Sequence, residues 1–130
     1  MIASPQQVRV LRGDDESEAT VEWRHVDGEW AVSVVLADGR RVDGHAVDAF
    51  EALCRVRDAL EIDGWRIGIV GAQVDVWPSG MARDQGGGLT AYRYGPQGVA
   101  GVVDTFAPAD PAATVTVVEQ RAAAEHAGLA

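Results

Sequence analysis

Alternating apolar and polar residues in the first third of the chain predict an antiparallel meander of strands. The clearest case is residues 20–26, where Val21 and Trp23 alternate with Glu22 and Arg24, the pattern of a strand with one buried face. Asp-Gly pairs at 27–28 and 38–39 are turn residues favoured between antiparallel strands. The sequence predicts four strands here and an acidic loop between the first two; the strands are residues 8–12, 20–26, 29–36 and 40–46, and the loop is residues 13–18.

Helical periodicity after residue 47 predicts the first helix. Asp48 and Glu51 have the spacing of a capping box, in which each side chain bonds the other residue's backbone N–H. Gly64 after Asp63 is typical of a helix end. The apolar side comprises Phe50, Leu53, Cys54, Val56, Leu60 and Ile62, and the remaining positions are Arg55, Arg57, Asp58 and Glu61.

The second half of the chain returns to extended patterns before a final helix. Residues 65–77 read as two short strands separated by a bulge or bend at Gly71, and residues 89–94 and 99–106 as two more. Thr116 and Glu119 again have capping-box spacing. We therefore expect a single α+β domain over residues 1–130. Its order is β-β-β-β-α-β-β-β-β-α, with an antiparallel sheet and the helices packed on one face.

Residues 77–88 contain more turn-forming residues than a connection between two strands requires. The segment holds Trp-Pro, Arg-Asp and three consecutive glycines. A phosphate-binding P-loop is excluded, because Leu89 and Thr90 follow the glycines where Lys and then Ser or Thr are needed. The better interpretation is that Ser79 caps one helical turn over residues 80–85, which the glycines end.

Arg83 would project from this turn and could bind a carboxylate or phosphate. The competing interpretation is an internal ion pair with Asp75 or Asp84, and for Trp77 it is simple core packing. A binding site requires these groups to line one concave pocket, and an internally paired Arg83 would count against it. The candidate binding residues are Asp75, Trp77, Ser79, Arg83, Asp84, Gly86, Gly87, Gly88 and Tyr92.

Other chemistry finds little support in the sequence. The three histidines, His25, His45 and His126, are far apart and the chain has one cysteine, so we expect neither a metal site nor a cofactor. Cys54 lies among apolar helix residues, where a thiol is usually inert. A pair of acids could form if Asp75, Asp84 and Asp104 meet in space, although a solvated acidic face is the simpler interpretation. We expect no catalytic residue.

The charge balance limits the partners that the chain can attract. Its net charge is −9, and residues 1–63 hold 7 Arg against 14 Asp and Glu. Such a field disfavours nucleic acids and acidic membrane surfaces and favours basic proteins. All eleven basic residues are Arg, and neither Lys nor Asn occurs, which indicates the codon bias of a GC-rich genome.

No run approaches the roughly 18 apolar residues of a membrane span, no secretory signal is visible, and the lone cysteine fits a reducing cytoplasm. The leading hypothesis is therefore a small acidic cytoplasmic protein-interaction module, such as an immunity protein that neutralises a toxin. In that hypothesis residues 14–18 and the meander form the partner surface. The alternative is a small-ligand or anion-binding protein, or an enzyme, with its site at residues 77–88. A homodimer through that segment or through an exposed sheet edge is a third.

A sequence block in the second half resembles one found in small uncharacterised bacterial proteins. It consists of Asp-Val-Trp-Pro-Ser-Gly-Met-Ala-Arg-Asp at 75–84 followed by Gly-Gly-Gly at 86–88, with Asp-Gly-Trp-Arg-Ile at 63–67 before it. The resemblance covers residues 48–121, and the chain departs from it at Val70, Gln73 and Gln85. It implies common ancestry and brings no activity with it.

Overall fold

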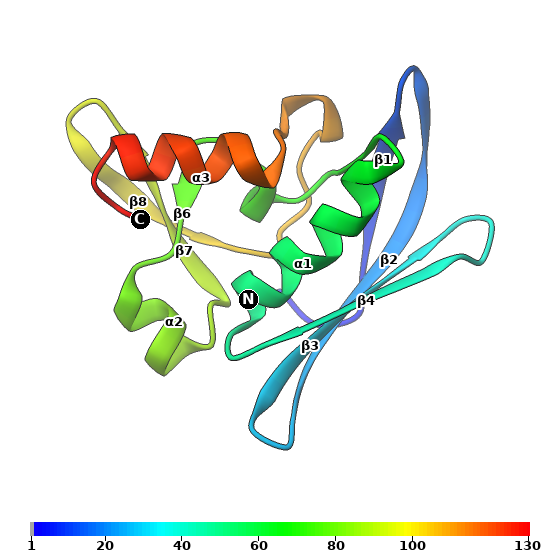
Figure 1. The fold of residues 1–130 in the computed structure, drawn as a ribbon, viewed down its shortest axis with the longest axis horizontal. Coiled ribbons are helices and arrows are strands. Elements are labelled where there is room, and N and C mark those ends of the chain that lie inside the picture. The colour runs from blue at the N-terminus through cyan, green and yellow to red at the C-terminus, as the bar shows by residue number, and fades with distance from the viewer. Residues whose placement is uncertain (1) are drawn as a thin grey trace.

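The computed structural model describes residues 2–130 and contains two antiparallel sheets with three α-helices (Figure 1). In chain order the elements are β1 (Gln6–Arg12), β2 (Asp15–Val26), β3 (Glu29–Leu36), β4 (Arg41–Ala46), α1 (Ala49–Ile62), β5 (Trp65–Ile67), the 3₁₀ turn η1 (Val70–Ala72), β6 (Val76–Trp77), α2 (Gly80–Gly86), β7 (Thr90–Gly95), β8 (Gly98–Asp104), the 3₁₀ turn η2 (Pro111–Ala113) and α3 (Val117–His126). One sheet has the strand order β4-β3-β2-β1-β5 and the other β6-β7-β8. The α+β class predicted from the sequence is confirmed.

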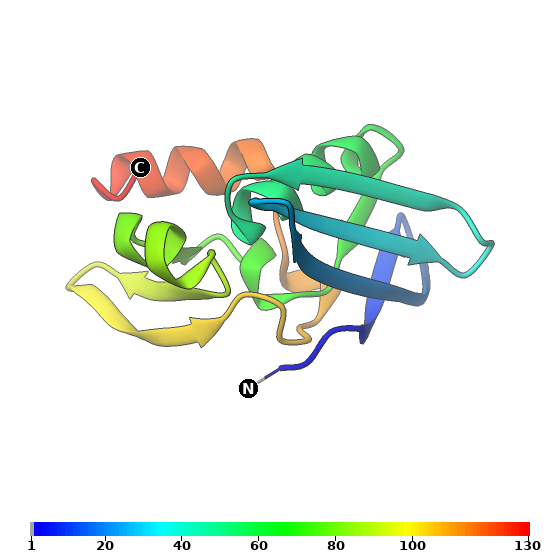
Figure 2. The same ribbon diagram turned by 90° about the horizontal axis from the view of Figure 1, so that it is seen from below.

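The two sheets lie in different halves of the molecule. In Figure 2 one half of the molecule contains the five-stranded sheet and α1. The other half contains the three-stranded sheet with α2 and α3. The sequence pattern predicted one sheet. The chain leaves the first sheet through η1, where the Gly71 N–H donates to the Thr105 carbonyl at 2.8 Å. A Cβ at Gly71 would lie 2.8 Å from that same oxygen, so only glycine fits this crossing.

The acidic segment after β1 is a strand where the sequence pattern predicted a loop. β2 begins at Asp15, and Glu16 and Glu18 pair with β1 in antiparallel register. Arg9 on β1 lies 3.0 Å from Glu16 and 3.7 Å from Glu18 between charged atoms, which offsets repulsion between the two acids. The following Asp27-Gly28 turn has positive φ at both residues, as the hairpin prediction required.

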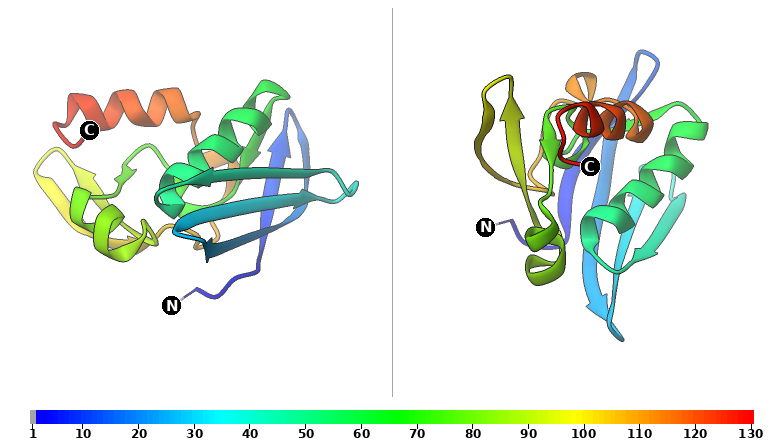
Figure 3. Two further views of the ribbon diagram at one scale, coloured as in Figure 1. Left: turned by 60° about the horizontal axis from the view of Figure 1, so that its bottom comes forward. Right: turned by 60° about the vertical axis from the view of Figure 1, so that its left-hand side comes forward.

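The main core lies between the five-stranded sheet and α1 (Figure 3). The side chain of Asp48 accepts the Glu51 N–H at 2.8 Å and fixes the start of α1, which is one half of the predicted capping box. The Glu51 carboxylate, predicted to bond back to Asp48, instead contacts Arg83 and Arg121. Gly44 on β4 lets the helix come close, because a Cβ there would lie 2.5 Å from the Ala52 carbonyl oxygen. The facing apolar residues are buried, and they include Val8, Val10, Val21, Val32, Val34, Leu53, Val56 and Leu60. Burial of each such side chain contributes about 1.5–3 kcal/mol.

A buried polar cluster joins α1 to the second half of the chain. Arg57 is 1% exposed, and its Nη1 donates to Oε1 of Gln120 on α3 at 2.5 Å. Its Nη2 donates to the Val115 carbonyl at 2.7 Å. Gln120 in turn donates to the carbonyls of Gly71 and Val76 at 2.9 and 2.7 Å. One guanidinium and one amide therefore connect α1, η1, β6 and α3.

The apolar side predicted for α1 is wrong at two positions. Arg57 lies inside because its hydrogen-bonding partners come from η1 and α3, which no local pattern reveals. Ile62, predicted to be on the apolar side, is 86% exposed because the helix ends there beyond the packed surface. None of the helices within residues 2–130 has both the length and the apolarity needed to cross a membrane.

We expect Arg57→Met to lower the free energy of unfolding by about 3 kcal/mol or more, since it leaves Oε1 of Gln120 and the Val115 carbonyl without their buried donor. Arg55→Met is the matched control on the same helix, because Arg55 is exposed and, among residues 2–130, donates only to the His45 carbonyl. It should cost less than about 1 kcal/mol. Urea unfolding followed by circular dichroism measures both, and similar losses would contradict a structural role for the buried cluster.

Candidate functional site

The segment singled out by the sequence forms a short helix with defined caps. The Ser79 hydroxyl accepts the Ala82 N–H at 3.0 Å, and Gly87 ends α2 in the left-handed conformation at φ 66°. Its N–H and that of Gly88 both return to the Ala82 carbonyl. The prediction of a Ser79-capped turn ended by glycines is confirmed.

The glycines bring the end of α2 against the start of α1 and the ring of Trp30. A Cβ at Gly87 would lie 2.6 Å from the Trp30 ring, and one at Gly88 would lie 2.8 Å from the Phe50 nitrogen. The Ala49 N–H donates to the Gly87 carbonyl at 2.6 Å. Since the N–H groups of Gly87 and Gly88 already have partners, they offer no anion cradle.

Arg83 makes its ionic contacts inside the molecule. Its Nη1 lies 3.3 Å from Oδ2 of Asp48 and 3.6 Å from Oε1 of Glu51, and its guanidinium lies 5.0 Å from the centre of the Phe50 ring. The ion pair predicted with Asp75 or Asp84 is therefore wrong in its partner. Asp48 performs two tasks, since it also caps α1, and its side chain is only 5% exposed.

Trp77 is buried between α1, α2 and α3, as its core interpretation predicted. It is 4% exposed, packs edge-on against Phe50 with ring centres 5.2 Å apart, and lies under both Arg83 and Arg121. Arg121 from α3 also lies 3.7 Å from Glu51 between charged atoms. Glu51 therefore balances two arginines, one from α2 and one from α3.

Of the remaining candidate residues, Asp75 and Asp84 lie apart from this cluster, and Tyr92 adjoins it at Trp77. Asp75 pairs with Arg93 at 2.9 Å. Tyr92 lies opposite Trp77 in the strand register, beside Met81 in a hollow against α2. Asp84 is exposed on α2 and has no ion pair within the described part of the chain. The nine predicted residues thus do not line one concave pocket, and sequence reasoning missed Asp48, Glu51 and Arg121, which do meet Arg83 or Trp77.

Two hollows do open on the three-stranded sheet. The larger, of about 710 Å³, lies between the β7–β8 hairpin and α3 and is lined mainly by apolar groups, among them Tyr94, Val99, Ala123 and Leu129. The smaller, of about 230 Å³, lies against α2 beside Met81, Tyr92 and Val102. Their linings share no residue with the Asp48–Arg83 contacts.

No protein-family model matches the chain, and no curated protein is similar to it at a significant level. The resemblance of residues 48–121 to small bacterial proteins therefore stays a prediction. Within residues 2–130, no group of three or more His, Cys, Asp or Glu is placed to hold a metal ion.

Cys54 is 1% exposed in the small core around Phe50 and Trp77. Burial raises the pKa of its thiol to about 11. The nucleophilic thiolate is therefore scarce at neutral pH.

We expect Gly87→Ala to destabilise the protein by at least about 1 kcal/mol, because alanine resists the left-handed conformation and its Cβ would strike Trp30. Gly86→Ala is the matched control one residue earlier, where a Cβ meets open space inside α2. It should be neutral or stabilise the protein by up to about 1 kcal/mol. Equal effects in thermal unfolding would refute the docking role of Gly87.

We expect Cys54 in the native protein to react with a disulfide reagent such as Ellman's at least about a hundredfold more slowly than in the urea-unfolded chain. The reason is its burial together with its raised pKa. Absorbance of the released thiolate follows the reaction. Rapid native labelling would show that the core around Cys54 opens readily.

Proposed function

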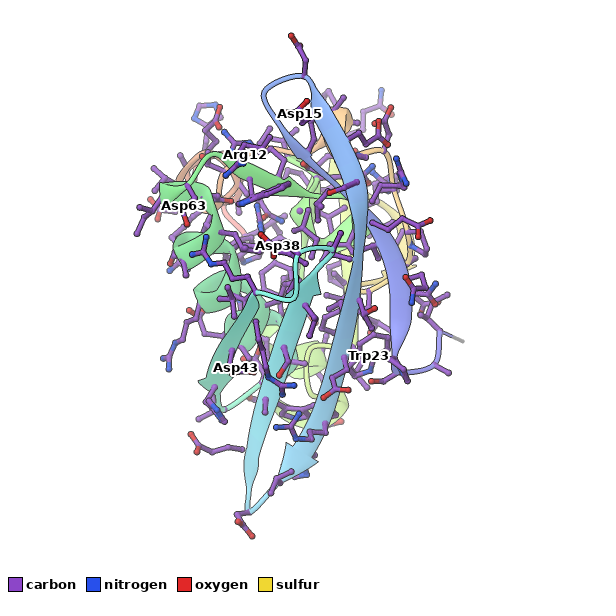
Figure 4. All side chains as sticks on the ribbon, turned by 90° about the vertical axis from the view of Figure 1, so that its right-hand side faces the viewer. Arg12, Asp15, Trp23, Asp38, Asp43 and Asp63 are labelled. Atoms are coloured by element: carbon purple, nitrogen blue, oxygen red, sulfur yellow. The ribbon has the colours of Figure 1, made fainter. Side chains whose placement is uncertain are left out.

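We propose that this chain is a small protein-interaction module whose acidic end binds a basic protein. We define the acidic end as Asp14, Asp15, Asp38 and Asp63, which lie in or directly beside the β1–β2, β3–β4 and α1–β5 turns. Figure 4 shows Asp15 at the top on the β1–β2 hairpin, Asp63 to the upper left at the end of α1, and Asp38 nearer the middle on the β3–β4 turn. The presence of aspartates at three turns on this side of the five-stranded sheet, most of them exposed, is the observation that carries the proposal.

Contacts between the turns hold the acidic end together. Arg40 in the β3–β4 turn pairs with Asp63 at the end of α1 at 2.5 Å, and Arg12 on β1 lies over Trp65 on β5. Asp38 accepts the Arg40 N–H at 2.9 Å, which orders its own turn. The carboxylates are therefore presented on connected turns of a packed sheet, so less entropy is lost on binding than from a free acidic tail.

Among the described residues, an arginine pairs with only one of the four carboxylates of the acidic end, namely Asp63, whose partner is Arg40. Asp14, Asp15 and Asp38 are exposed and have no ion pair among the described residues. Arg57 and Arg83 form their ion pairs elsewhere in the molecule, and the last turn of α1 contains no basic residue. The negative end of the α1 dipole points the same way and adds to the field. Such a field speeds encounter with a basic surface.

These contacts favour an interaction module over a ligand site at residues 77–88. A ligand site there would need Arg83 and the glycine amides to face an open pocket, and they face Asp48, Ala82 and the ring of Trp30. The particular role we propose is that of an immunity protein that neutralises a basic toxin. Its support is the acidic end and the small size of the chain. A toxin reading frame beside the gene would fit this role, and metabolic neighbours would speak against it.

The test is capture of a partner by the tagged full chain from a lysate of its native cell. We expect one basic protein in stoichiometric amount, with binding that weakens as salt is raised. The triple variant Asp14→Asn, Asp15→Asn and Asp38→Asn should weaken binding about tenfold, because each change removes one carboxylate from the proposed contact.

The matched control removes three charges elsewhere through Asp27→Asn, Asp84→Asn and Glu125→Gln, all at exposed positions. It should retain nearly full binding. Recovery of no stoichiometric partner would overturn the proposal. Equal weakening by both triple variants would show that net charge alone, and not the acidic end, attracts the partner.

A further inference from the structure

We propose that the free edge of β8 is a self-complementary surface through which two copies of this chain pair in antiparallel fashion. The inference concerns a surface distant from the acidic end and does not rest on the proposed function. Figure 1 and Figure 3 show β8 at the outer margin of the three-stranded sheet, with β7 on its other side.

The edge of β8 lacks the charges that usually protect an open strand. Its residues 98–103 are Gly-Val-Ala-Gly-Val-Val, with no charged side chain and no proline. Val99 and Val102 are 53% and 65% exposed. The other edges differ, since β6 has two residues, β5 has three, and β4 carries Arg41, Asp43 and His45. Only β8, among the described strands, combines a long edge with an uncharged surface.

A β-bulge places both exposed valines on the same face. Val102 lies opposite Tyr92 and Val99 opposite Tyr94, so Ala100 is the extra residue. Without the bulge, residues three apart would point to opposite faces. Tyr92 and Val102 border the hollow against α2, and Tyr94 and Val99 border the one against α3. The edge therefore offers unpaired backbone groups together with one continuous apolar face.

A second copy fits this edge because Val99 and Val102 lie at equal distances from the middle of the segment. If the two-fold axis passes between Ala100 and Gly101, Val99 of each copy lies opposite Val102 of the other. Such directly opposed apolar pairs stabilise antiparallel strands. In the same register Asp104 lies opposite Gln97, so no two carboxylates face each other. Each valine would then lie beside one of the two hollows of the other copy.

The charge distribution also favours the β8 edge over the other surfaces of the chain as the place where a second copy binds. Two chains of net charge −9 repel each other, and contact through the acidic end would bring like charges together. The β8 edge avoids this repulsion, because residues 98–103 carry no charged side chain. The bulge increases the local twist and limits pairing to a short stretch, so we expect a dimer in rapid exchange with monomer.

The test is the mass of the full chain by sedimentation equilibrium over about a hundredfold range of concentration. We expect a shift from the 13.8 kDa monomer toward twice that mass. The double variant Val99→Glu and Val102→Glu puts carboxylates opposite each other and should weaken dimerisation at least about tenfold. Val118→Glu is the matched control, since Val118 is 75% exposed on α3, away from the edge; it should dimerise like the original protein.

Hydrogen exchange on the unmodified chain gives a readout that does not depend on the folding of any variant. At high concentration we expect amide exchange to slow in residues 98–103 and nowhere in the acidic end. The Asp14, Asp15 and Asp38 triple variant should still dimerise, which separates this inference from the proposed function. A protein that stays monomeric at every concentration would overturn the inference. The same holds if β8 pairs only with a different protein and not with a second copy of this chain. A dimer unaffected by the double variant would also overturn the inference.

Discussion

The buried guanidinium of Arg57 is the constraint on which the arrangement of the two halves depends. A buried charge is costly unless its donors are satisfied, and burial lowers the pKa of this arginine. Its donors reach Gln120, Val115 and Gly71, and Glu61 of α1 lies 3.6 Å away and also accepts the first N–H of α3. Burial likewise raises the pKa of Glu61. Because the partners come from separate segments, any shift of η1 or α3 away from α1 would leave buried polar groups unpaired.

The parts of the fold that could be predicted are those decided by neighbours in sequence. The meander, the caps at Asp48, Ser79 and Thr116 and the turn at Asp27 rest on local periodicity and local hydrogen bonds, and the structure has them. The division into two sheets could not be predicted, because it depends on η1 meeting Thr105 more than thirty residues away. The prediction that Arg57 lies on the polar side of α1 was wrong for the same reason. Its charge suggested solvent, whereas its partners lie up to 63 residues along the chain.

The glycine-rich segment shows how a correct local prediction can lead to a weak functional one. Three consecutive glycines are more than a turn requires, which suggested a binding loop. In the structure Gly87 and Gly88 instead allow close packing against Trp30 and Phe50. Arg83 pairs with Asp48. The sequence predicted that Asp48 begins α1, but it did not show that the start of α1 lies next to α2. From sequence alone, close approach to a ligand and close approach to another part of the same chain require the same residues.

The two surfaces that remain open differ in chemistry and lie at opposite ends of the molecule (Figure 1). The acidic end repels a second copy, and the β8 edge presents no charge to one. Pairing through β8 would leave both acidic ends directed outward. Interactions between exposed charges beyond about 8–10 Å are largely screened at physiological salt. Self-association and recognition of a basic protein are therefore compatible in one small domain, and a dimer would offer two acidic ends to a partner with repeated basic sites.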